Sequence, residues 1–522
     1  QLTLCFLLMF LFSLFLLSIS DMGWRKGAYK CVQSVFFLMS IFIIFSGDIT
    51  RKILRVLLTL TVLNFAYYNY MYGKIDAGTI LSILESNPGE VVEFYATLDF
   101  MIAIKSILLA LVFWLLAGII QTKINLIKPK KYKFLWPFIM AFTLFMAGKI
   151  SKHYKKKNLG ANESLLKLVW EGSTKFLEQD VYTHYIGAFS RYLLITEQYD
   201  REITSHWKDI SRTGVKSKDL YFLVIGESAR KSAYGLYNQN LNTTPGLGDL
   251  AHMKIVSDPI APAVQTRESV IRILALNNEK QVLYGYNIID LAKTAGMETF
   301  WISNQSKVGE NDSLITSFAK RSDHFTFLNN GHYRKSKTDN HLLPFIEKAI
   351  SKKGNKAKLI IVHTMGSHNS FCARVWKKFI TENIEDKKQC YYNSIHNSYL
   401  LLEELMNLAK KEGKSFKGIF LSDHGLVKAN KSPYYVHGAG GRYSREAVEV
   451  PFMFFSDQVK DDTSEDKIID KTYFLRDFVH TFAHWVGLSG EKIDYSKSVL
   501  SSDMMKQKNY ILRSDFKVAP LK

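Results

Sequence analysis

Residues able to bind a metal follow short apolar runs in the second half of the chain. Glu227 comes directly after "YFLVIG", and Asp423 and His424 come directly after "GIFLS". Two carboxylates and one imidazole suit zinc, with manganese as an alternative, better than a structural metal held by thiolates. Such a set leaves one coordination position open. We therefore predict a catalytic metal centre at Glu227, Asp423 and His424.

Each of these residues also has an ordinary structural explanation. Glu227 could form an ion pair with the neighbouring Arg230, and Asp423 with His424 could cap a following helix. That several strand candidates end in such residues favours the metal interpretation.

Two hydroxyl groups compete for the role of nucleophile. A metal that polarises phosphorus–oxygen bonds needs an attacking group, either water or an activated side-chain hydroxyl. Ser228 is adjacent to Glu227, whereas Thr266 lies in "APAVQTRESVIRIL", where a loop meets a helical apolar pattern. Free backbone amides at a helix start can bind a phosphoryl oxygen, which favours Thr266. The alternative for Thr266 is a plain helix N-cap.

Four more polar residues are candidates for substrate contacts. His368 in "TMGSH" and His437 in "YYVHGAGGRY" could contact phosphoryl oxygens, protonate a leaving group or hold a second divalent metal. Single histidines more often satisfy a local hydrogen bond. Asn304 ends another apolar run, and Lys307 after "WISNQS" could contact a charged headgroup, although a solvated lysine is the default in so basic a chain.

The elements expected to position these residues are strands that alternate with helical segments. This alternation predicts a largely parallel sheet covered on both faces, with ligands beyond the carboxyl ends of its strands. The strand candidates are 220–226, 252–257, 298–303, 358–363, 417–421 and 450–456.

The first part of the chain has the composition of a membrane domain. Each of its long apolar runs can cross a hydrocarbon layer of ~30 Å as a helix. A cleaved signal peptide is an alternative for the first run, but the runs after it favour a retained span. We predict about five transmembrane helices, at 3–19, 32–47, 53–73, 99–121 and 134–150.

The length of the chain indicates more than one domain. A chain of 522 residues is too long to fold around a single hydrophobic core of ordinary size. We expect a transmembrane domain at 1–151, bridging amphipathic helices at 152–217 and a catalytic α/β domain at 218–522. Loop 74–98 is read as a connector or as a surface segment that borders a lipid-binding site. Lysines flank both sides of the last run, so charge counting leaves the topology open.

The net charge and the cysteines restrict the partners. The 68 Lys and Arg against 48 Asp and Glu give a formal charge of +20, which suits an anionic partner such as phospholipid or phosphorylated glycan. No nucleic-acid motif accompanies this charge. Cys372 and Cys390 could form a disulfide in an oxidising compartment, with two free thiols as the alternative.

The motifs together resemble the membrane-bound phosphoethanolamine transferases of Gram-negative envelopes, in the alkaline phosphatase and sulfatase superfamily. The stretch "VIGESARKSAYGLYNQNLNTTPGL" is similar to the family signature, and "HTMGSH" and "SDHG" are similar to two later motifs. "VHG" ahead of "EVPFMFF" fits the last motif. The resemblance covers most of the chain.

This resemblance implies an N-terminal bundle of about five transmembrane helices and a C-terminal α/β/α sandwich of the alkaline phosphatase and sulfatase type. It implies a multi-pass protein of the bacterial inner membrane with a periplasmic catalytic domain. His368 and His437 would lie near the metal for substrate or second-metal contacts. The implied ligands of the catalytic zinc are Glu227, Thr266, Asp423 and His424.

The implied reaction is a two-step transfer. Thr266 takes phosphoethanolamine from phosphatidylethanolamine, releases diacylglycerol, and passes the group to an acceptor. Lipid A, a core sugar of lipopolysaccharide and another surface glycan are all open as acceptor, and the cationic charge favours lipopolysaccharide. Two departures from the family pattern bear on this choice, since cysteines are absent around Thr266 and Leu426 replaces a glutamate often found there.

Three alternative functions are kept open. One is a phosphoglycerol transferase of the lipoteichoic acid synthase type, whose donor would be phosphatidylglycerol. Another is a sulfatase or phosphodiesterase that hydrolyses rather than transfers. The third is a non-catalytic membrane protein that binds anionic glycans.

Overall fold

The computed structural model describes most of the catalytic part and segments of the N-terminal part. The described residues are 2–18, 31–32, 34–35, 38, 48–71, 75–85, 99–125, 182, 184–196, 204–213, 219–246, 252–279, 281–306, 314–329, 337–378, 386–428, 435–436, 438, 443–457 and 467–521.

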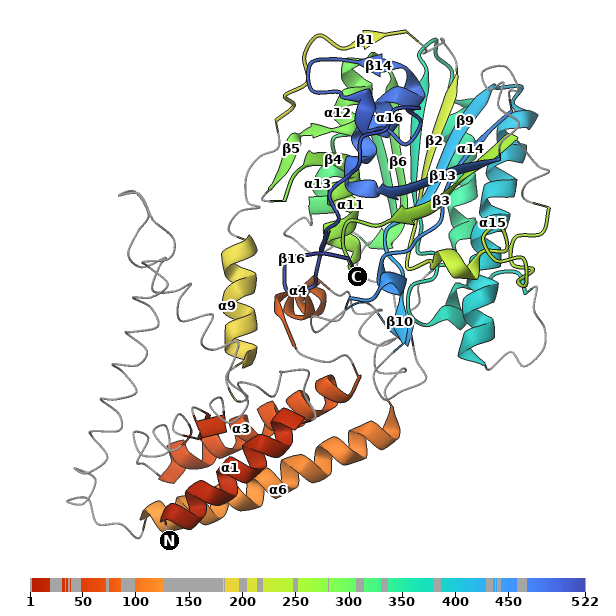
Figure 1. Cartoon of the computed structure of the whole chain (residues 1–522). Coiled ribbons are helices and arrows are strands. Elements are labelled where there is room, and N and C mark those ends of the chain that lie inside the picture. The colour runs from red at the N-terminus through yellow and green to blue at the C-terminus, as the bar shows by residue number, and fades with distance from the viewer. Residues whose placement is uncertain are drawn as a thin grey trace, which may run out of the picture.

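An eight-stranded mixed sheet forms the centre of the C-terminal part, with strand order β13-β3-β12-β9-β2-β8-β6-β7 (Figure 1). Only β12 in this sheet runs antiparallel to its neighbours β3 and β9, and the other pairs are parallel. The strands are β2 (Leu220–Gly226), β3 (His252–Ile260), β6 (Glu298–Ser306), β7 (His324–Asn329), β8 (Lys358–His363), β9 (Phe416–Ser422), β12 (Phe452–Ser456) and β13 (Ile468–Phe474).

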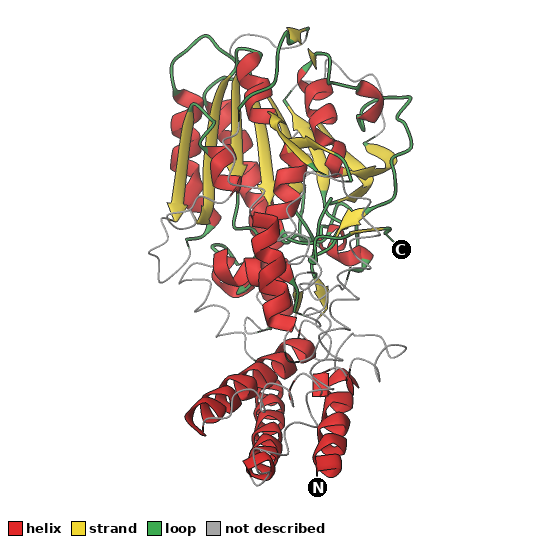
Figure 2. Cartoon of the chain, turned by 90° about the vertical axis from the view of Figure 1, so that its left-hand side faces the viewer, coloured by secondary structure: helices red, strands yellow, loops and turns green. Residues whose placement is uncertain are grey.

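Helices cover both faces of this sheet, as Figure 2 shows. The first face carries α11 (Thr266–Leu274), α12 (Ile288–Thr294), α13 (Leu314–Ala319) and α16 (Phe478–Val486). The second face carries α14 (Leu343–Ser351) and α15 (Lys387–Lys411). The domain is therefore an α/β/α sandwich.

The sequence of β2 explains its central place. All of its residues are buried, as in a strand covered on both faces. Because side chains alternate along a strand, Leu223 and Ile225 enter the core on the α11 side, and Phe222 and Val224 enter the core on the α15 side.

The six predicted strands are all present, and two strands of the sheet were missed. Both β7 and β13 are edge strands. In β13, exposed and half-buried residues alternate along most of its length, and β7 begins with two exposed residues. Edge strands need fewer apolar residues than central strands, so their sequence signal is weaker.

Part of the predicted bridge belongs to the catalytic fold. The strand β1 (Ser211–Arg212) pairs with β14 (Leu488–Ser489). Trp207 is buried, and its Nε1 donates a hydrogen bond to the carbonyl of Asn287 at 2.8 Å. Within the same bridge, α9 (His184–Thr196) is also described.

The N-terminal part contains three long helices that lie together in Figure 1: α1 (Leu2–Ser18), α3 (Asp48–Met71) and α6 (Phe100–Asn125). They correspond to the predicted spans 3–19, 53–73 and 99–121. Most of runs 32–47 and all of 134–150 lie outside the described residues. Among the described helices, one segment, Phe100–Lys123, is long and apolar enough to cross a membrane. This test therefore supports one of the five predicted spans among the described residues. The helix α1 is too short to pass it, and α3 begins with several charged residues.

A disulfide joins Cys372 to Cys390. This confirms the pairing expected for these two cysteines. It ties the short helix η5 (Phe371–Arg374), which follows the "TMGSH" turn, to the first turn of α15.

Candidate metal centre and nucleophile

The three predicted metal ligands meet at the carboxyl ends of two neighbouring strands. Gly226 of β2 is in register with Ser422 of β9, so the residues that follow them leave the sheet side by side. One ligand atom from each of Glu227, Asp423 and His424 lies within 4.8 Å of the other two. All three side chains are buried.

The imidazole of His424 is held in the tautomer that a metal ligand needs. Its Nδ1 lies 2.8 Å from the carbonyl oxygen of Gly425. A carbonyl can only accept, so Nδ1 carries a proton and Nε2 is the nitrogen left to bind a metal. Nε2 lies 3.4 Å from Glu227 Oε1 and 3.4 Å from Asp423 Oδ2.

The two oxygens of Asp423 have different surroundings. Oδ1 accepts hydrogen bonds from the backbone amides of Ser228 at 3.0 Å and His424 at 2.7 Å. Oδ2 is buried and accepts no hydrogen bond from the described part of the chain. A carboxylate with one oxygen fixed and one buried oxygen unsatisfied is what a metal ligand requires.

The charges of the cluster also fit a cation. Burial, and then the charge of Glu227, raise the pKa of Asp423 to about 8. Burial acts to lower the pKa of His424, but the charges of Asp423 and Glu227 outweigh it and raise this pKa to about 9. Two buried carboxylates thus need positive charge nearby, and a divalent ion such as zinc matches both the charge and the donor types.

Thr266 is the first residue of α11, and its hydroxyl faces the metal ligands. The N-cap of this helix is Gln265, whose backbone is extended. The hydroxyl of Thr266 therefore does not act as the helix cap. Thr266 Oγ1 donates a hydrogen bond to Glu227 Oε2 at 3.0 Å and lies 3.2 Å from His424 Nε2. The structure therefore brings the predicted nucleophile and the predicted ligands together.

The competing hydroxyl, that of Ser228, is fully buried. Ser228 Oγ donates to Glu227 Oε1 at 2.6 Å. Its backbone has a φ of 57°, an unusual conformation for a residue with a side chain. Ser228 thus orients the carboxylate of Glu227, whereas Thr266 is partly exposed and accessible to a substrate.

The sequence also allowed two structural explanations, an ion pair of Glu227 with Arg230 and a helix cap at Asp423 and His424. The structure favours neither. Arg230 forms an ion pair with Glu446 at 3.0 Å. After Asp423 and His424 the chain continues into the short strand β10 (Val427–Lys428) rather than into a helix.

The "TMGSH" turn is packed against the backbone of Glu227. Gly366 has a φ of +46°, and a Cβ atom at this position would lie 2.8 Å from the backbone nitrogen of Glu227. The amide of Ser367 donates to the Glu227 carbonyl at 2.9 Å. The turn leaves His368 half-buried beyond it, outside the three-ligand cluster. His437 and Lys307 lie outside the described residues.

Two residues that support the candidate site were missed, Gln305 and Asp339. Gln305 follows Asn304 in the chain, and Asp339 accepts a hydrogen bond from the Asn304 side chain. Gln305 Nε2 donates to Glu227 Oε2 at 3.3 Å and to the Thr364 carbonyl at 2.8 Å. Asn304 Nδ2 instead donates to Asp339 Oδ1 at 2.7 Å. Alternation from Trp301 does not reach Gln305, because the register of β6 shifts between Ser303 and Ser306, so the sequence offered no signal for it.

Asp339 connects this strand end to the "TMGSH" turn. It accepts hydrogen bonds from the amides of Met365 at 2.9 Å and Gly366 at 2.8 Å, in addition to that from Asn304. Burial raises the pKa of Asp339. The amide of Asn304 therefore supports the turn that precedes His368, while its predicted contact with substrate stays a prediction.

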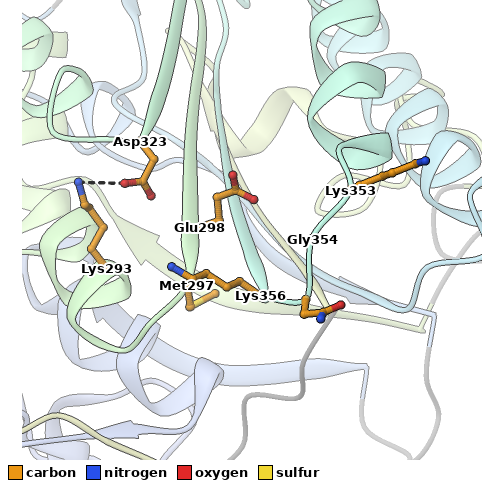
Figure 3. Close-up of a pocket in the computed structure, with 8 residues that line it drawn as sticks. Lys293, Met297, Glu298, Asp323, Lys353, Gly354 and Lys356 are labelled. Carbon is orange, nitrogen blue, oxygen red and sulfur yellow. Dashed lines mark ion pairs between the residues drawn. The ribbon is translucent and has the colours of Figure 1, made fainter.

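A separate pocket of about 430 Å³, shown in Figure 3, lies at the amino ends of strands β6, β7 and β8. It is lined by residues at the start of β6 and in the loop that precedes β8, including Glu298 and Lys356. Lys293 and Asp323 in its wall form an ion pair of 3.1 Å. This pocket contains neither Thr266 nor the three candidate metal ligands. It is therefore separate from the candidate site, which lies at the carboxyl ends of the strands.

An α/β/α sandwich with candidate metal ligands and a hydroxyl at its strand ends is consistent with the alkaline phosphatase superfamily expected from the sequence motifs. The Sulfatase family model matches residues 219–488, just over half of the 522-residue chain. The chain belongs to the Sulfatase family.

Its relatives include enzymes named phosphoethanolamine transferases. The chain is 30% identical over 312 residues to phosphoethanolamine transferase OpgE of Escherichia coli K12, which covers 59% of this chain and 58% of OpgE. The chain thus spans less than two thirds of the length of that relative.

Two solved structures share the fold. The zinc complex of the C-terminal periplasmic domain of EcEptC from Escherichia coli matches with a TM-score of 0.53 and 21% identity, over 60% of this chain and 95% of that one. The integral membrane protein lipooligosaccharide phosphoethanolamine transferase A (EptA) from Neisseria meningitidis matches with a TM-score of 0.58 and 14% identity, over 95% of this chain and 98% of that one.

Proposed function

We propose that this chain transfers phosphoethanolamine from phosphatidylethanolamine to a lipopolysaccharide component, lipid A or a core sugar, or to another surface glycan. The observation that carries the proposal is the placement of Thr266 Oγ1, 3.0 Å from Glu227 Oε2 and 3.2 Å from His424 Nε2. The names of the relatives support phosphoethanolamine as the transferred group.

The residues that would hold a zinc ion are Glu227, Asp423, His424 and Thr266. Zinc bound there supplies a positive charge that polarises the phosphoryl oxygen and lowers the pKa of the threonine hydroxyl. The zinc complex of the EptC domain supports the choice of metal. Manganese is compatible with the same four donors. His368 and His437 are candidates for holding a second divalent ion.

The protein's own residues carry the two transfer steps. In the first, Thr266 Oγ1 gives its proton to Glu227 Oε2 and forms a bond to phosphorus as the bond to the glycerol oxygen breaks. His368 or His437 supplies the proton that diacylglycerol takes up. In the second, an acceptor oxygen attacks phosphorus and its proton returns to the histidine, while the bond to Thr266 breaks and Glu227 returns the proton to Thr266 Oγ1.

We infer that the N-terminal part anchors the enzyme in the bacterial inner membrane. About five transmembrane helices at 1–151 and a bridge at 152–217 would precede a periplasmic catalytic domain at 218–522. The apolar helix Phe100–Lys123 supports a membrane domain, and the full-length match to EptA supports its connection to such a domain. The disulfide Cys372–Cys390 supports an oxidising compartment.

The test compares cells that carry the wild-type chain, the Thr266→Ala variant or neither. Mass spectrometry of extracted lipids and glycans should show added phosphoethanolamine with the wild type alone, at equal membrane abundance of both proteins. Added phosphoglycerol, or free phosphoethanolamine without a modified acceptor, would replace the proposal by one of the alternatives. Equal modification by Thr266→Ala would remove the threonine mechanism.

A further inference from the structure

The loop that delivers Thr266 is held by a hairpin close to the C-terminus. This hairpin consists of β15 (Ile511–Leu512) and β16 (Val518–Ala519). The amide of Leu512 donates to the carbonyl of Pro262 at 2.8 Å, and Leu512 forms a parallel bridge with Ala263. The position of the nucleophile loop therefore depends on the position of the hairpin.

The turn of the hairpin is bound by α4 (Ala77–Glu85), a short helix between the apolar helices α3 and α6. The amide of Gly78 donates to the carbonyl of Ser514 at 3.0 Å. Ser514 Oγ donates to Asp76 Oδ2 at 2.5 Å, across 438 positions of sequence. Figure 1 shows α4 beside β16, on the side of the domain that faces α3.

Asp76 is committed to this junction through both carboxylate oxygens. Oδ1 accepts the amide of Thr79 at 3.0 Å, which is the hydrogen bond of a helix N-cap. Oδ2 accepts the hydroxyl of Ser514. Both residues are buried. The start of α4 and its attachment to the hairpin are thus specified by one side chain.

Gly78 lets α4 reach the residue that precedes the nucleophile. A Cβ atom at Gly78 would lie 2.4 Å from the Ser514 carbonyl oxygen and 2.5 Å from Gln265 Oε1. Any larger residue would have to move the hairpin or Gln265, the N-cap of α11. Glycine is a poor residue for a helix interior, and the close approach accounts for its presence here.

We propose that α4 is a positioning element for the transfer reaction: through Gly78 and Ser514 it fixes Gln265, and thereby directs the hydroxyl of Thr266 at Glu227 and His424. The inference rests on the proposed role of Thr266. It makes the membrane-side half of the chain a part of the catalytic machinery, because a reacting atom displaced by about 1 Å loses about 10²-fold in rate.

The first test places Gly78→Val in the full chain, with Leu84→Val on the exposed side of the same helix as the matched control. With vesicles of phosphatidylethanolamine as donor, we expect Gly78→Val to lower the single-turnover rate constant of phosphoethanolamine transfer to Thr266, at saturating lipid, by about 10- to 100-fold. The lipid concentration that gives half of the maximal rate should stay within about twofold, and the bound metal should be unchanged. Leu84→Val should behave as the wild type. A wild-type rate constant in Gly78→Val would overturn the inference.

A second readout does not depend on the reaction. Hydrogen exchange of the full chain should be faster in 261–266 and 511–519 for Gly78→Val and for Ser514→Ala. Ser514→Thr, which keeps the hydroxyl, should restore slow exchange. Unchanged exchange in 261–266 would overturn the inference even if wild-type protein transfers nothing from phosphatidylethanolamine, an outcome that would instead remove the proposed function.

Discussion

At the residue scale, burial assigns different roles to the two hydroxyls beside Glu227. Ser228 Oγ is fully enclosed and orients one carboxylate oxygen, whereas Thr266 Oγ1 contacts the other oxygen from a partly exposed position. Both residues could be identified from the sequence, but only the fold separates a supporting hydroxyl from an attacking one.

We predict that Thr266→Ser keeps activity while Thr266→Ala loses it. Serine retains the attacking oxygen but not the methyl group that restricts its rotamer, so the rate should fall by no more than about 10-fold. Alanine removes the oxygen, and the rate should fall by at least about 10³-fold. The initial rate of phosphoethanolamine transfer by purified full-length protein checks both. Equal loss in the two variants would argue against an attacking oxygen at this position.

We also predict a pH-dependent stability of the metal-free protein. The folded-state pKa values of Asp423, about 8, and His424, about 9, both lie above the ordinary 3.8 and 6.5. Each group stabilises the fold while protonated and loses that contribution as pH rises through the folded value. The Tm of metal-free protein should therefore fall between pH 6.5 and 9, and zinc should stabilise it more at pH 9 because binding displaces these protons.

Thermal unfolding with and without zinc measures this effect, and Asp423→Asn is the control. The variant cannot lose the proton in question, so the pH dependence of its metal-free Tm should be smaller than that of the wild type. The interpretation fails if the metal-free wild type gains stability over this range relative to Asp423→Asn.

The sequence was sufficient to predict that Glu227 and Asp423 lie close together, because each residue comes directly after the end of a strand. It was not sufficient for Gln305, because an amide within "SNQS" has no distinctive spacing and its adjacent Asn304 has the same chemistry. Which of these two side chains faces the candidate ligands depends on the irregular end of β6, where the register shifts between Ser303 and Ser306.

At the element scale, the "TMGSH" turn and the end of β2 act as one unit. Gly366 approaches the backbone of Glu227 so closely that the turn fixes the position of a metal ligand. Asp339 holds this turn in place, because its carboxylate accepts hydrogen bonds from the backbone amides of Met365 and Gly366. A change in this turn should therefore affect both folding and metal binding.

We predict that Gly366→Ala destabilises the protein more than Gly413→Ala does, and that Gly366→Ala alone of the two weakens zinc binding. Both glycines have positive φ, +46° and +59°, so both variants carry backbone strain of about 1–2 kcal/mol. A Cβ at Gly413 meets nothing within 4 Å, whereas at Gly366 it would press on Glu227. This overpacking should cost a further 1–3 kcal/mol or so.

The free energy of unfolding by denaturant and a zinc titration of each variant measure the difference. Equal destabilisation of Gly366→Ala and Gly413→Ala, with equal zinc affinity, would show that the close approach to Glu227 is unimportant.

The central strands could be predicted because burial on both faces makes them continuous apolar runs. The edge strands β7 and β13 could not, since one side of each is exposed and their composition is mixed. The reversal of β12 was also missed, because strand direction leaves no mark on composition.

At the scale of the whole molecule, the N-terminal helices and the α/β/α domain meet through α4 and the hairpin of β15 and β16. The hydrogen bond between Asp76 and Ser514 joins positions 438 residues apart. No local pattern in the sequence indicates such a contact. Loop 74–98 was interpreted as a connector or as a surface segment, whereas in the structure Asp76, in its first part, has a buried partner in Ser514.

The proposed membrane-spanning role of α6 leads to a prediction about charge placement. Leu111 is exposed near the middle of the apolar helix, and Phe100 is exposed at its start. An aspartate at the centre of a span costs about 2.5–3.5 kcal/mol of insertion free energy, and much less near the water interface. Leu111→Asp should therefore reduce membrane insertion of segment 100–123 strongly, and Phe100→Asp only slightly. Equal insertion of both in a microsomal insertion assay would contradict a membrane-spanning α6.

The most direct measurement is the mass of the Thr266 peptide after the zinc-loaded full-length protein meets phosphatidylethanolamine vesicles without an acceptor. The account predicts phosphoethanolamine on Thr266 itself, absent when zinc is removed and absent in Thr266→Ala. An unmodified Thr266 peptide alongside transfer to an added acceptor, or a modification on Ser228 instead, would contradict it.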